Sequence, residues 1–80
     1  MISDTAAVLP LGLVPAGRKA VIKDIIGGEC MRRRLIEMGF NRGATVRVIA
    51  NENGPLIVAL EESRMVLGQG MAQKVMVQEA

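Results

Sequence analysis

The chain has 80 residues, which is room for one domain, and half of them are hydrophobic, which argues against global disorder. Its formal net charge of +2 is too small to indicate a dedicated polyanion binder. Cys30 is the single cysteine, so an intramolecular disulfide is excluded and a reducing, cytoplasmic environment is favoured.

Residues 1–8 are expected to form a flexible N-terminal tail without the basic start of a signal peptide. No apolar run approaches the ~20 residues that a membrane-spanning helix needs, so we expect no direct membrane insertion. Pro15-Ala16-Gly17 then predicts a turn that leads into a strand over residues 18–26. That stretch is predicted as a strand because it is rich in β-branched residues.

One helix is predicted over residues 29–38, where the apolar period changes to i, i+4 and i+7. Gly39 follows in the position of a left-handed C′ residue. Phe40 would then pack back on Leu35, the contact that accompanies a Schellman ending. The apolar stripe of this helix consists of Met31, Leu35 and Met38.

Four further strands are predicted, over residues 45–50, 56–60, 65–67 and 73–78, from their alternating apolar positions. Asn53-Gly54 predicts a hairpin turn, and residues 68–72 a turn or a single helical turn. Short strands and tight turns in a small chain favour a closed or nearly closed barrel, since closure removes exposed sheet edges. We therefore expect a mainly β fold, a small β-barrel with one short α-helix, as a single domain over residues 9–80.

Several segments together resemble the ferrous iron transport protein A (FeoA) family. The family's helix carries an R-L-x-x-M-G run followed shortly by a glycine, and this chain has such a run from Arg34 to Gly39, with Gly43 after it. Ordered agreement over several segments is more specific than one short motif. The other matching segments are Gly27-Gly28, Leu11 to Gly17, Gly54-Pro55 and Met65 to Val77.

The resemblance implies an SH3-like barrel in the bacterial cytoplasm, active in ferrous iron transport and iron homeostasis. It implies a partner, the membrane ferrous iron transporter FeoB, which carries a cytoplasmic GTP-binding domain. The motif residues would then hold the fold, and they are Gly28, Arg34, Leu35, Met38, Gly39 and Gly43. In the family, the same domain also occurs at the end of metal-dependent repressors of the diphtheria-toxin-repressor type. A stand-alone accessory protein is the better match to this chain.

Catalysis is not expected, because the chain has no histidine to act as a base near neutral pH and Cys30 has no such partner. No glycine-rich phosphate loop is followed by the lysine and hydroxyl of a P-loop. We expect no cofactor and no metal site, since a stable Fe²⁺ or Zn²⁺ site takes several ligands at defined spacing. The available ligand candidates are Cys30, Glu29, Glu37, Glu61 and Glu62.

The strongest charged feature is Arg32-Arg33-Arg34 in the predicted helix. It is either a solvated face, with Arg33 and Glu37 spaced i, i+4 as a weak pair, or a docking patch. Met76, on the outward side of the last predicted strand, is a candidate for exposed apolar contact. The residues we expect to contact a partner are Arg32, Arg33, Glu37 and Met76.

Two alternatives to an accessory protein that docks onto a transporter remain open. Small basic barrels bind nucleic acid, but single-strand binders stack bases on aromatic side chains, and the predicted strands contain none, so nucleic acid is not the expected partner. A self-assembling structural module is the other alternative, because barrels with open edges can associate with themselves.

Overall fold

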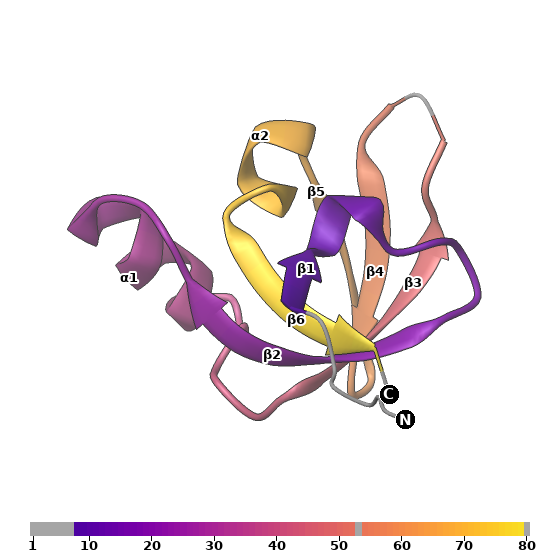
Figure 1. The fold of residues 1–80 in the computed structure, drawn as a ribbon, viewed down its shortest axis with the longest axis horizontal. Helices are drawn as coiled ribbons and strands as arrows, with labels where there is room; N and C mark the ends of the chain where they lie inside the picture. Colours follow the sequence, from indigo (N-terminus) through magenta and orange to yellow (C-terminus); the bar gives the residue numbers. More distant parts are fainter. Residues whose placement is uncertain (1–7, 53, 80) are drawn as a thin grey trace.

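The computed structural model describes residues 8–52 and 54–79 and shows a curled antiparallel sheet with one helix projecting from its end (Figure 1). The sheet order is β1-β6-β2-β3-β4-β5. Its strands are β1 (Val8–Pro10), β2 (Lys19–Ile25), β3 (Thr45–Ala50), β4 (Leu56–Leu60), β5 (Ser63–Leu67) and β6 (Val75–Glu79). The helical segments are the 3-10 turn η1 (Leu11–Leu13), α1 (Glu29–Glu37) and α2 (Gln69–Ala72). The mainly β class is therefore confirmed.

Apart from shifts of one residue at the ends of β2 and β6, the strands differ from the predicted ones at three places. The described residues form six strands rather than five, because β1, which begins at Val8 at the end of the expected tail, pairs with β6. β5 begins at Ser63, two residues early, since the turn before it needs only two residues. β6 begins late, at Val75, because Gln73 caps α2. Of the predicted Asn53-Gly54 turn, Asn53 lies outside the described residues.

The core fills the concave side of the curled sheet. Alternate residues of β3, β4 and β6 point inward, and in the described part of the chain no polar or charged residue is buried. Phe40 is the largest fully buried side chain. Asn51 closes one end, where its side-chain amide donates hydrogen bonds to the carbonyls of Gly12 (3.0 Å) and Val14 (2.8 Å). Burial of the apolar side chains of this core supplies most of the free energy that stabilises the fold.

Helix α1 ends in the predicted Schellman motif. The Gly39 N–H donates to the Ile36 carbonyl and the Phe40 N–H to the Leu35 carbonyl, both at 3.0 Å. Gly39 has φ +105°, in the left-handed region that favours glycine. The motif turns the chain back so that Phe40 enters the core. No helix in the described part of the chain is long and apolar enough to cross a membrane.

Candidate functional site

Helix α1 lies at one end of the molecule and projects away from the sheet (Figure 1). Of its nine residues, only Leu35 is buried. Ile36 on the helix and Ile26, which precedes it, are each 45% exposed. A helix in a small domain is normally stabilised by packing an apolar face on the core. Most of the surface of α1 is uncovered, and so are Ile36 on the helix and Ile26 just before it. We therefore take α1 as the best candidate for contact with another molecule.

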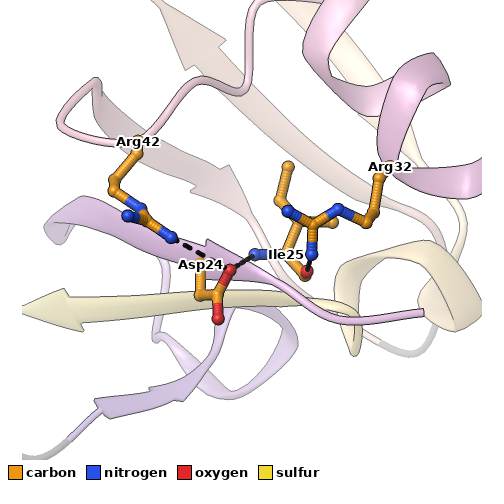
Figure 2. Close-up of polar contacts among 4 residues, drawn as sticks. All are labelled: Asp24, Ile25, Arg32 and Arg42. Carbon is orange, nitrogen blue, oxygen red and sulfur yellow. Dashed lines mark hydrogen bonds and ion pairs between the residues drawn. The ribbon is translucent and has the colours of Figure 1, made fainter. Parts of the chain in front are cut away.

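Arg32 joins α1 to the sheet. Its guanidinium Nη1 donates a hydrogen bond of 2.8 Å to the main-chain carbonyl of Ile25, at the end of β2 (Figure 2). The contact is partly buried, and the donor is charged, so it is stronger than an exposed neutral hydrogen bond. Arg32 is predicted to contact a partner; in the structure its guanidinium bonds to the end of β2 and so ties the helix to the sheet.

Asp24 organises the same stretch of β2. Its Oδ1 accepts a hydrogen bond of 2.8 Å from the Ile25 N–H and lies 3.6 Å from Nη2 of Arg42 (Figure 2). The pairing of β2 with β6 shifts register just before Asp24. Both side chains of the Arg42–Asp24 ion pair are largely exposed, so the pair adds little to stability. The pair joins the loop after α1 to β2.

Two shallow hollows lie on either side of α1. One lies between the helix and β2, where Arg32, Arg42 and the exposed Ile36 surround buried core side chains. The other lies on the outer face of α1 and contains charges of both signs. The residues that line the outer hollow are Glu29, Cys30, Arg33, Arg34 and Glu37.

The four residues predicted to contact a partner do not form one surface: two line the outer hollow of α1, and two lie near β2. Arg33 and Glu37 both line the outer hollow of α1, although within the described residues no ion pair joins them. Arg32 faces β2 instead. Met76 is half-buried on β6 and pairs across the sheet with Asp24, so it lies near the hollow between α1 and β2 rather than on the helix.

The residues predicted to hold the fold also differ in their contacts. Leu35 is buried and Met38 packs against the core at the C-cap of α1. Gly43 has φ +91° and donates its N–H to the Ile22 carbonyl at 2.8 Å. Gly28 is the N-cap of α1, and Arg34 lies exposed in the outer hollow. Arg32, not Arg34, is the arginine of the run that bonds to the sheet.

Three features of this site were not predicted. They are the exposed Ile36 and Ile26, and the Asp24–Arg42 pair. Asp24 interrupts a β-branched strand, which was a usable signal for an irregularity there. The described residues contain no cluster of three His, Cys, Asp or Glu side chains that could hold a metal ion.

Replacing Arg32 by Ala is expected to loosen α1 while the sheet stays folded. Loss of a partly buried, charge-assisted hydrogen bond should destabilise the docked helix by about 1–2 kcal/mol. Hydrogen exchange should therefore be faster at the amides of α1, with little change in β3 and β4. The matched variant Arg33→Ala removes an exposed charge and should leave this exchange unchanged. Equal exchange in the two variants would mean that Arg32 does not hold the helix.

The chain matches known proteins over nearly its whole length. The family model for the FeoA domain matches residues 9–79. A Methanocaldococcus jannaschii protein with the provisional name Fe(2+) transport protein A is 38% identical over 71 residues, which cover 89% of this chain and 87% of that protein. These matches agree with the resemblance found in the sequence.

Solved structures share the fold. The crystal structure of an iron uptake regulatory protein (FeoA) matches with a TM-score of 0.87 and 35% identity, covering 92% of this chain and 100% of that one. FeoA of Stenotrophomonas maltophilia, an SH3 domain protein crystallised with zinc, matches with a TM-score of 0.77 and 29% identity, covering 86% and 88%. The chain therefore belongs to the FeoA domain family and has its SH3-like fold.

Proposed function

We propose that this chain is a non-catalytic cytoplasmic accessory protein of bacterial ferrous iron uptake that docks through α1 onto the GTP-binding region of a FeoB-type transporter. Family membership supports the role in iron transport. The M. jannaschii relative is named for Fe(2+) transport, and the S. maltophilia protein is described as a candidate activating factor of ferrous iron transport. The observation that carries the docking proposal is the projecting helix, of which only Leu35 is buried.

Binding is favoured over chemistry by the residues available. The chain has no histidine, and the hollows beside α1 are shallow and open rather than enclosed around converging polar groups. Any nucleotide hydrolysis in the complex would belong to the transporter. The accessory protein would act through differential affinity for the transporter's nucleotide states.

The surface of α1 has the composition of a small docking site. Ile36 and Ile26 supply exposed apolar area, and Arg33 and Glu37 supply charges of opposite sign beside it. Interfaces of this kind bury an apolar centre and surround it with a polar rim that sets orientation. The hydrogen bond from Arg32 to Ile25 holds the helix in place before binding, which lowers the entropy that association must overcome.

The test is to measure the affinity of the purified transporter GTP-binding region for wild-type protein and two α1 variants. Ile36→Glu should weaken binding about tenfold or more, because it places a charge at the apolar centre of the interface. The swap Arg33→Glu with Glu37→Arg preserves an i, i+4 pair on the helix but reverses its orientation, and should weaken binding less.

The matched control is Glu52→Lys, an exposed charge reversal in the turn between β3 and β4, which should bind as the wild type does. Circular dichroism would verify that each variant is folded. Equal affinity of the Ile36→Glu variant and the wild type would exclude α1 as the docking element. Absence of binding by the folded wild type, in every nucleotide state, would contradict the proposed partner.

A further inference from the structure

A row of basic side chains crosses the outward face of the sheet. Lys19 on β2 is the cross-strand partner of Arg47 on β3. Arg47 is the partner of Ala59 on β4, and Ala59 is the partner of Arg64 on β5. All three basic residues are exposed. The register thus places them in one line that ends at β5.

This basic row has no acidic partner within ion-pair distance. In the described part of the chain the ion pairs are Arg18–Glu79 and Arg42–Asp24, and neither involves the row. Like charges directly opposite each other on neighbouring strands, as for Lys19 and Arg47, are destabilising. The turn residues Glu61 and Glu62 line the hollows beside the row but lie farther than 4.0 Å from its nitrogen atoms. The side chains of the row therefore remain available to pair with an anionic ligand.

An apolar row lies next to the basic row. Val66 on β5 pairs with Ile57 on β4, and Ile49 lies beside them where the register of β3 shifts. Val66 is 62% exposed, whereas Ile57 and Ile49 are half-buried. Like the basic row, the apolar row ends at β5. Anything that covers the end of both rows must therefore offer an anionic group and an apolar group side by side.

The outer edge of β5 can accept a further strand. β5 is the last strand of the sheet, and its five residues include no proline or glycine. The other edge strand, β1, has only three residues and contains Pro10, so it is a poor template. β5 follows a two-residue turn, and the pairs after such a turn alternate between hydrogen-bonded and non-bonded. The main-chain N–H and C=O groups of Arg64 and Val66 consequently face the free edge.

We propose that the edge of β5 binds an extended acidic segment of a partner protein, which adds to the sheet as a strand and carries a carboxylate and an apolar side chain two residues apart, so that both lie on its outward face. A carboxylate beside Arg64 would neutralise the end of the basic row, and an apolar side chain beside Val66 would cover the apolar row. Main-chain hydrogen bonds to Arg64 and Val66 would supply affinity, while the two side-chain rows supply specificity. This site is separate from α1 and does not depend on it.

A second copy of the chain fits this edge less well than an acidic segment. Antiparallel pairing of two β5 edges with matching hydrogen bonds sets Arg64 opposite either Arg64 or Val66 of the other copy, or sets the two Val66 residues opposite each other. Each of these registers brings two basic rows together and sets no carboxylate directly opposite Arg64. Charge complementarity therefore favours an acidic partner.

The test uses a short synthetic peptide that repeats Glu-Ser-Val-Ser, which sets glutamate and valine on one face of the strand, with a Lys-Ser-Val-Ser repeat as its matched control. Binding to isotope-labelled protein is followed by amide chemical shifts. The acidic peptide should shift the amides of Ser63–Leu67, and the basic peptide should not. Arg64→Glu should weaken binding about fivefold or more. Lys23→Glu on β2, a matched charge reversal outside both proposed sites, should bind as the wild type does.

Val66→Pro separates strand addition from simple charge attraction. It removes an N–H that faces the free edge while the bonds to β4 remain, a position where edge strands tolerate proline. Loss of peptide binding by the folded Val66→Pro variant supports the proposal. If that variant unfolds, the same acidic peptide with its main-chain nitrogens methylated, which keeps its charges but cannot pair as a strand, should fail to bind the wild type.

Three results would overturn the proposal. They are equal binding of the two peptides, unchanged binding by a folded Val66→Pro variant or of the methylated peptide, and a wild-type dimer in sedimentation that Arg64→Glu alters. The last result would assign the β5 edge to a second copy of the chain.

Discussion

Replacing Phe40 by Ala should lower the free energy of unfolding by about 3–5 kcal/mol, the range for truncating a buried aromatic side chain. Phe40 is the chain's single aromatic residue and its largest fully buried side chain. Its N–H also donates a hydrogen bond to the Leu35 carbonyl, so the same residue fixes the C-terminal end of α1 against the core. Because small domains are stable by only about 5–15 kcal/mol, the variant should be close to unfolding at 37 °C. Urea denaturation followed by circular dichroism measures the change.

Phe40→Leu is the matched control for this substitution. It keeps most of the apolar volume and should cost clearly less than the alanine variant. A loss of under about 1 kcal/mol for Phe40→Ala would mean that the side chain is not packed in the core as the structure shows.

Gly39→Val should destabilise the protein by about 2 kcal/mol or more. Gly39 has φ +105°, where a side chain is strained whatever the space around it, and a β-branched residue fits worst. An added Cβ would lie 3.5 Å from Cδ1 of Leu60, an ordinary contact, so the backbone rather than crowding sets the cost. Thermal unfolding should show a clearly lower midpoint.

Gly70→Ala is the control for the glycine argument. Gly70 lies within α2 with an ordinary φ and open space around its Cα, so a methyl group there should be neutral or raise stability by up to about 1 kcal/mol. An unchanged melting midpoint for Gly39→Val would refute the assignment of Gly39 as the left-handed residue that ends α1.

Local signals account for the parts of the fold that the sequence predicts well. The alternation in residues 45–50 and 56–60 predicts strands whose inward residues are indeed buried. The period of residues 29–38 and the Gly39-Phe40 pair predict both α1 and its Schellman ending. Strand β1 was missed because three residues ending in a proline carry almost no local strand signal. Its pairing with β6 comes from tertiary contact alone.

The site was harder to predict because its key contacts join distant residues. Three consecutive arginines look alike in sequence, and only the placement of the Ile25 carbonyl at the end of β2 distinguishes Arg32 from Arg33 and Arg34. Ile36 fits the apolar content of the helix, but its exposure depends on how far α1 projects from the sheet. Similarly, the line from Lys19 through Arg47 to Arg64 exists only in the sheet register.

The docking of α1 onto the transporter is tested most directly by titrating the unlabelled GTP-binding region into isotope-labelled protein and following the amide signals. The proposal predicts saturable changes concentrated in α1 and in the neighbouring Ile26, with β3 and β4 unaffected. Changes confined to Ser63–Leu67 would assign the transporter to the β5 edge instead. No change at saturating concentration would contradict docking altogether.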